Sequence, residues 1–262
     1  MATCTVVTAY YPVPSKHDHS DYRTWISRFL PTVTTPMVIF TDAETAPMLQ
    51  RLRGSHPTEV IVQPFETLRF ASPRFLKYWE RDYERDHERH IHTPYVYVIW
   101  NEKTAFVERA MKLDPFKTEF FTWCDIGMMR EPAGHEIYAR WPSPESLVPL
   151  DRDRVYMLAV EPFQPSDMHI LPNGLPAQFR EKNRIGAGVI LGSKRALEQW
   201  ISAYYNMVDA FIAADYFAGK EQSIMNTIAI KHPHLVHLIQ PMPYTLNGQP
   251  GDRWFYMLWH FK

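Results

Sequence analysis

One aspartate occupies a position where many α/β proteins bind ligands. Asp125 follows the apolar segment FFTWC at 120–124 and precedes Gly127 by two residues. The carboxyl end of a central strand is a common ligand site, and glycine lets a backbone approach the ligand closely. Carboxylate oxygens suit Mg²⁺ or Mn²⁺, so Asp125 could hold a divalent cation against a diphosphate. Alternatively, Asp125 caps the following turn.

Glycines form a second feature. The chain has only 10, and three lie in IGAGVILGS at 185–193, including Gly186 and Gly188. Glycine at these positions indicates either tight packing or a ligand close to the main chain. The spacing does not match a dinucleotide-binding fingerprint, because further strand follows before the next helix. GxxxxGK[ST] and GxSxG are both absent, which disfavours a P-loop kinase and an α/β-hydrolase.

Polar residues at two predicted helices could contact a substrate. Glu221 and Gln222 lie where a helix begins, so they could bind hydroxyl groups, and Glu221 could act as a general base or only complement the helix dipole. Asn101 and Lys103 lie in the helix expected at 94–113, where Lys103 interrupts an otherwise apolar face. Lys103 could neutralise a phosphate, although most such residues are simply solvated.

The 12 histidines give little support for a zinc site. His87, His90 and His92 lie in a run of mixed charge that is typical of a solvated helix end, and there is no HExxH motif or cysteine pair. His260 differs by its position. It follows an aromatic segment at 253–259 that we expect to be a terminal strand, so it could turn back towards a metal held by Asp125.

Composition limits the class of protein. The 262 residues are 45% hydrophobic and carry 28 basic and 29 acidic groups, which excludes a disordered chain and gives no overall charge to attract nucleic acid. Two cysteines are too few for a disulfide framework and fit a reducing compartment. No signal peptide or transmembrane segment is recognisable, so we expect a cytoplasmic protein.

The hydrophobic pattern predicts an α/β fold. The first 63 residues alternate between strand-like and helix-like segments, which indicates a mostly parallel sheet with ligands at the carboxyl ends of its strands. No repeat or composition shift marks a boundary, so we expect one domain over residues 1–262. Strands are expected at 3–10, 37–41, 59–63, 120–125, 154–160, 188–191, 235–240 and 253–259, and helices at 20–31, 43–53, 73–88, 94–113, 193–214 and 220–231.

Five segments, in this order, resemble the HtrL/YibB-like proteins, which are regarded as glycosyltransferases of the GT-A type, some encoded with bacterial surface-polysaccharide genes. These segments are TVVTAYY, IWNEKTAFVERA, FFTWCDIGMMR, GAGVILGSKRALEQW and GKEQSIMNTIA, and the similarity spans about residues 3–240. The resemblance implies a single-domain, Rossmann-related GT-A fold. It also implies a nucleotide-diphospho-sugar donor, a hydroxyl acceptor such as a glycan, and transfer assisted by Mn²⁺ or Mg²⁺.

The resemblance also assigns residues to the donor. Asp125 takes the place of the acidic metal-binding motif, but the sequence has Asp-Ile-Gly there instead of two aspartates, so His260, water and the diphosphate would complete the coordination. The residues implied to contact nucleotide, diphosphate or sugar are Thr8, Tyr10, Lys103, Gly186, Gly188, Glu221 and Gln222. A binding module of the same fold without activity, or a metal-dependent phosphoesterase, are the alternatives.

Overall fold

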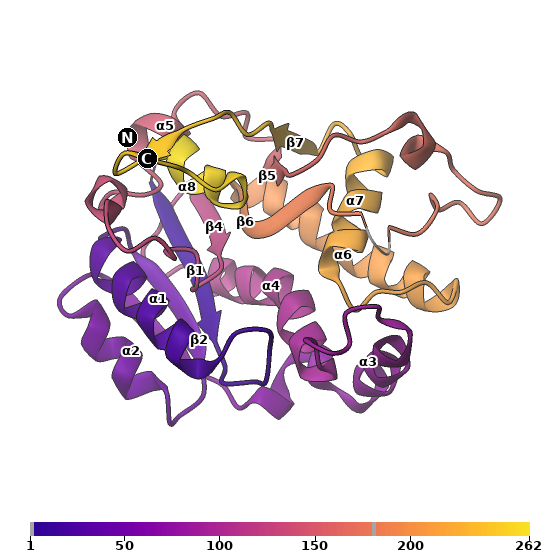
Figure 1. The fold of residues 1–262 in the computed structure, drawn as a ribbon, viewed down its shortest axis with the longest axis horizontal. Coiled ribbons are helices and arrows are strands. Elements are labelled where there is room, and N and C mark those ends of the chain that lie inside the picture. Colours follow the sequence, from indigo (N-terminus) through magenta and orange to yellow (C-terminus); the bar gives the residue numbers. More distant parts are fainter. Residues whose placement is uncertain (1–2, 180–181) are drawn as a thin grey trace.

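The computed structural model describes residues 3–179 and 182–262. Within these residues, seven strands form a mixed sheet in the order β3-β2-β1-β4-β6-β5-β7 (Figure 1). The strands are β1 (Cys4–Tyr10), β2 (Met37–Thr41), β3 (Thr58–Val62), β4 (Phe120–Cys124), β5 (Val155–Ala159), β6 (Ile185–Ser193) and β7 (Val236–Ile239). A separate hairpin pairs β8 (Thr245–Leu246) with β9 (Gln249–Pro250).

The sheet is mostly parallel, as the sequence predicts. Strand β1 pairs in parallel with β2 and β4, β2 with β3, and β5 with β7, whereas β6 is antiparallel to both β4 and β5. The carboxyl ends of β1 and β4 therefore meet the beginning of β6 at one edge. Cys124 pairs with Val189, which places Asp125 opposite Gly188.

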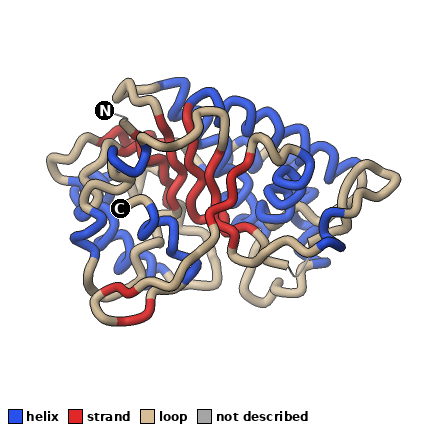
Figure 2. Tube along the Cα trace, turned by 90° about the horizontal axis from the view of Figure 1, so that it is seen from above, coloured by secondary structure: helices blue, strands red, loops and turns tan. Residues whose placement is uncertain are grey.

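Helices cover both faces of the sheet (Figure 2). Residues of α1, α2, α5 and α8 pack into the apolar cluster on one face, and residues of α3, α4, α6 and α7 into the cluster on the other. The α-helices are α1 (His19–Thr32), α2 (Ala46–Arg53), α3 (Pro73–Arg85), α4 (Pro94–Leu113), α5 (Pro144–Leu147), α6 (Lys194–Ala213), α7 (Glu221–Lys231) and α8 (Tyr256–His260). Short 3₁₀ helices span Phe65–Thr67, Arg69–Ala71, His135–Tyr138, Pro165–Met168 and Arg253–Phe255.

Helix boundaries follow local chemistry. Helix α4 begins where predicted, because the Thr93 hydroxyl accepts a hydrogen bond from the Val96 amide. Ser193 caps α6 in the same way through the Ala196 amide. The prediction that Pro31 ends α1 is not met. The helix runs on to Thr32, because losing one amide donor still leaves the Val33 amide bonded to the Phe29 carbonyl.

The predicted terminal strand at 253–259 is wrong. The segment instead forms a 3₁₀ turn followed by α8. The Asp252 carboxylate accepts the Trp254 amide and so starts a helical turn. Tyr256, Met257 and Leu258 then all pack into the apolar cluster. In the described ranges, no helix has the length and hydropathy needed to cross a bilayer.

Candidate functional site

A cavity of about 530 Å³ opens at the carboxyl ends of β1 and β4. Its wall draws on β1 and the loop after it, α4, the segment after β4, the start of β6 and the start of α7. Of the predicted site residues, those that line it are Tyr10, Lys103, Asp125, Gly188, Glu221 and Gln222. Residues from five separate elements of the sequence thus meet at the edge that the parallel strands predict.

Lys103 connects two carboxylates at this cavity. Its ammonium lies 3.0 Å from Asp125 Oδ1 and 2.8 Å from Glu221 Oε1, and it donates to the Ala187 carbonyl at 3.1 Å. The Lys103 and Glu221 side chains are only 4% and 5% exposed, whereas that of Asp125 is 40% exposed. Burial disfavours the charged amine, but the two carboxylates outweigh it and raise the pKa of Lys103. The two carboxylates therefore favour the charged form of the lysine.

The backbone around Asp125 fixes its carboxylate. The Asp125 amide donates to the Gly188 carbonyl at 2.8 Å, which extends the β4–β6 pairing, and Trp123 Nε1 donates to Asp125 Oδ1 at 2.7 Å. A Cβ on Gly188 would lie 2.9 Å from Met128 Sδ and 3.7 Å from Asp125 Oδ2. A side chain at 188 would therefore press on Met128, and Gly188 also lines the cavity, so both interpretations of this glycine stay open.

Gly186 serves packing instead. A Cβ there would lie 2.9 Å from Val160 Cγ2 and 3.0 Å from a methyl carbon of Leu158, and Gly186 is not on the cavity wall. Thr8 is also away from the wall, because it lies inside β1, fully buried, and only the residues after it reach the strand end. The structure thus does not bring these two predicted residues to the site.

Asn101 is buried and makes hydrogen bonds that position a neighbouring segment. It is fully buried, and its Nδ2 donates to the carbonyls of Tyr97 at 2.9 Å and Ala218 at 3.3 Å. Its Oδ1 accepts from the Tyr204 hydroxyl at 2.8 Å. Asn101 therefore holds the segment that leads into Glu221, without lining the cavity itself.

His260 is not brought to Asp125. It lies at the end of α8, where its ring packs against Tyr256 and Phe261, and it is not on the cavity wall. Its pKa is lowered by burial and by the nearby His237. The prediction that His260 approaches Asp125 depended on the terminal strand, and α8 directs the residue elsewhere.

One group of side chains in the described ranges is arranged so that it could hold a metal ion. The ligand atoms of Asp86, Glu88 and His92 lie within 4.8 Å of one another. Asp86 Oδ2 already hydrogen-bonds His92 Nδ1 at 2.7 Å and the Tyr97 hydroxyl at 2.6 Å, and despite burial these bonds lower the pKa of Asp86. Glu88 and His92 reach the cavity wall. The sequence pattern singled out His92 but not Asp86 or Glu88, because a segment with many charges of both signs does not indicate which of its acids face a site.

Three basic residues of the cavity wall were also missed as candidate site residues. Lys16, His17 and Arg130 line it, with Arg130 over the Trp25 ring at 4.3 Å. Arg130 directly follows the Asp-Ile-Gly-Met-Met segment, so its closeness to Asp125 along the chain was the available signal.

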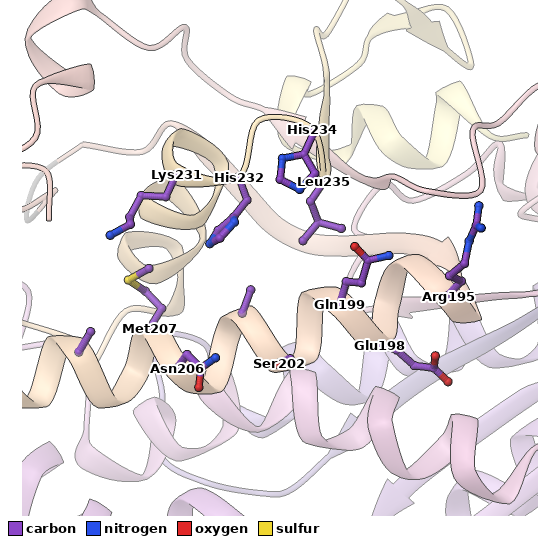
Figure 3. Close-up of a pocket in the computed structure, with 12 residues that line it drawn as sticks. Arg195, Glu198, Gln199, Ser202, Asn206, Met207, Lys231, His232, His234 and Leu235 are labelled. Carbon is purple, nitrogen blue, oxygen red and sulfur yellow. The ribbon is translucent and has the colours of Figure 1, made fainter. Parts of the chain in front are cut away.

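A second, more open groove of about 740 Å³ lies between α6 and the end of α7 (Figure 3). It lies towards the amino ends of the parallel strands, because α6 starts after β6 ends and Leu235 directly precedes β7. None of the predicted site residues lines this groove.

Comparisons with known proteins define the family. A comparison of the sequence with curated proteins finds no significant match. A similar solved structure is the apo form of mouse xyloside xylosyltransferase 1, with 11% sequence identity and a TM-score of 0.44 over 91% of this chain and 84% of that chain. The model of the HtrL_YibB family, described as a bacterial protein of unknown function, matches residues 3–247, and the chain therefore belongs to the HtrL/YibB family.

Proposed function

We propose that this protein is a glycosyltransferase of the GT-A type, which moves a sugar from a nucleotide-diphospho-sugar to a hydroxyl group of an acceptor such as a glycan. The observation that carries the proposal is the cluster of Lys103, Asp125 and Glu221 in a cavity at the strand ends. The resemblance of the sequence motifs to proteins regarded as glycosyltransferases supports the same reaction class.

The cluster suits the sugar part of such a donor. One ammonium and two carboxylates leave a net charge of −1, and both carboxylates can accept hydrogen bonds from sugar hydroxyls. During transfer the anomeric carbon becomes cation-like, and fixed negative charge beside it lowers the barrier. Because Lys103 and Trp123 already hold Asp125, its carboxylate needs little reorganisation when the sugar binds.

Glu221 acts in this proposal by orienting the sugar. Its carboxylate is buried and paired with Lys103, so it is poorly placed to collect the acceptor proton. In the reaction, the bond between the anomeric carbon and the β-phosphate oxygen breaks, and its electron pair stays with the nucleoside diphosphate. A bond forms to the acceptor oxygen, and the acceptor's hydroxyl proton is released.

The residues around Asp125 do not fit a resident Mn²⁺ or Mg²⁺. Asp125 Oδ1 already faces both the Lys103 ammonium and the Trp123 indole, so an ion there would lie against a positive charge. Position 127 offers no second acid. The group of Asp86, Glu88 and His92 is compatible with a divalent cation. Its carboxylates are already bonded, however, to His92 and to Lys220, and we assign no step of the transfer to a cation there.

Turnover of a donor panel tests the proposal. Wild-type protein should release nucleoside diphosphate from at least one nucleotide-sugar, and Asp125→Asn should reduce that rate at least 100-fold, or about 2.7 kcal/mol, because the variant loses the charge but keeps the side-chain shape. Asp209→Asn is the matched control, since Asp209 is 61% exposed and pairs with Arg74 on the surface. Nucleotide-sugar binding without turnover would identify a binding module instead, and unchanged activity in Asp125→Asn would refute the proposed role.

A further inference from the structure

Lys16, His17 and Arg130 lie together on the cavity wall. Arg130 Nη1 lies 3.2 Å from His17 Nε2, and both side chains pack on Trp25. Lys16 is exposed and adjacent, and together with burial and Arg130 it lowers the pKa of His17. The rings of Trp25 and Phe255 lie 4.3 and 5.3 Å from the Arg130 guanidinium and hold it by cation–π contact.

The two cations of this group, Lys16 and Arg130, have little negative charge close to them. In the described part of the chain, no carboxylate lies within ion-pair distance of Lys16 or Arg130, and His17 has only Asp21 at 3.7 Å. By contrast, the wall's other two lysines both have carboxylate partners. Lys103 pairs with Asp125 and Glu221, and Lys220 pairs with Glu88. Asp252 also lines the cavity, and its carboxylate accepts the Trp254 amide. Among the described residues of the wall, the cations without a carboxylate partner are therefore Lys16 and Arg130.

Position 127 connects this cluster to Asp125. A Cβ on Gly127 would lie 3.0 Å from Trp25 and 3.4 Å from Tyr22, so an aspartate there would meet these two rings, of which Trp25 also supports Arg130. Arg130 Nε in turn donates to the Gly127 carbonyl at 3.2 Å. The chain thus has no second acid at this point, and an arginine stands over the same ring.

We propose that the diphosphate of the donor binds to Arg130 and Lys16, with His17 hydrogen-bonded beside them, and that the two cations neutralise its charge in place of a divalent cation at Asp125. This inference rests on the proposed function. Guanidinium and ammonium groups bind phosphate oxygens through charge-assisted hydrogen bonds and stabilise the departing diphosphate. The cluster around Lys103 carries a net negative charge, so charge favours contact of the diphosphate with Arg130 and Lys16 instead.

Calorimetric titration with UDP, GDP, ADP and CDP tests the inference. At least one diphosphate should bind wild-type protein in EDTA, with an affinity within about threefold of that in Mn²⁺. Arg130→Gln and Lys16→Gln should each weaken that binding, at least tenfold for Arg130→Gln, and inorganic pyrophosphate should compete. Arg51→Gln is the control, because Arg51 is an exposed residue of α2 that does not line the cavity.

The outcomes separate the two proposals. If a nucleoside diphosphate binds only when Mn²⁺ is present, or binds equally to wild type and to both variants, the diphosphate assignment is overturned while the transferase proposal stands. If no nucleoside diphosphate binds wild-type protein with or without Mn²⁺, both are overturned. Lys16→Gln keeps the test decisive should Arg130→Gln fail to fold, because Lys16 is exposed and lies in the loop before α1.

Discussion

Replacing Lys103 with methionine should expose the cost of the buried ion cluster. Methionine fills similar space but removes the ammonium that lies between Asp125 and Glu221. The Glu221 carboxylate, 5% exposed, would then be buried without its counter-ion. Asp125 is 40% exposed, so water can replace its lost partner, and its share of the cost should be small.

The magnitude follows from the burial. Removing one partner of a buried ion pair costs about 3–5 kcal/mol, which is a large part of the 5–15 kcal/mol that stabilises a typical domain. Adding Glu221→Gln to Lys103→Met removes the orphaned charge, so the double variant should recover about 1–3 kcal/mol relative to the sum of the single effects. It should not recover activity, because the cluster that we propose to bind the sugar is gone.

Urea unfolding of the wild type, both single variants and the double variant measures these free energies. Lys112→Met is the matched control, because Lys112 lies on the same helix and forms an exposed pair with Glu108 at 2.5 Å. That control should change stability by less than about 0.5 kcal/mol. A loss below about 1 kcal/mol for Lys103→Met, or strictly additive effects in the double variant, would refute the reasoning.

Two glycines and one glutamate give further tests. Gly188→Ala should destabilise the fold by under about 1 kcal/mol, because Met128 can shift, but it should raise KM for the donor; an unchanged KM would argue against a ligand there. Gly186→Ala should do the reverse, with a loss of about 1–3 kcal/mol in urea unfolding and unchanged kinetics in the folded variant; a neutral effect on stability would contradict the packing role. Burial raises the pKa of Glu102 to about 7, so the folded chain holds more protons than the unfolded chain from about pH 4.5 to 7. Unfolding free energy should therefore fall with rising pH in this window, by up to about 1.4 kcal/mol per unit, more steeply in wild type than in Glu102→Gln; parallel pH profiles would contradict this.

The sequence predicted at which edge of the sheet the candidate site lies, but it predicted only some of the residues that line the cavity there. Asp125 could be found because a carboxylate ends an apolar strand, and Lys103 because a charge interrupts an otherwise apolar helix face. Thr8 was misplaced because all of β1 is buried, so its pattern does not distinguish residues inside the strand from those at its open end. Asn101 is buried by a contact with Ala218, more than 100 residues away, which no local pattern encodes.

The remaining errors of prediction concern residues in loops and in the terminal segment. Arg130 lies in a connection that packs against Trp25 and Phe255, and Lys16 lies next to His17, which also packs on Trp25. Hydrophobic periodicity carries no information about the paths of such connections. His260 was linked to Asp125 through an expected strand, but the cap at Asp252 makes the segment helical. Short aromatic segments fit either structure until tertiary contacts decide between them.

Comparing the affinity of an intact nucleotide-sugar with that of its nucleoside diphosphate, in wild type and in Asp125→Asn, tests the central claim most directly. If Asp125 faces the sugar, the substitution should weaken binding of the nucleotide-sugar at least tenfold, about 1.4 kcal/mol, and change binding of the nucleoside diphosphate less than twofold. Equal effects on both ligands, or no effect on either, would contradict the account.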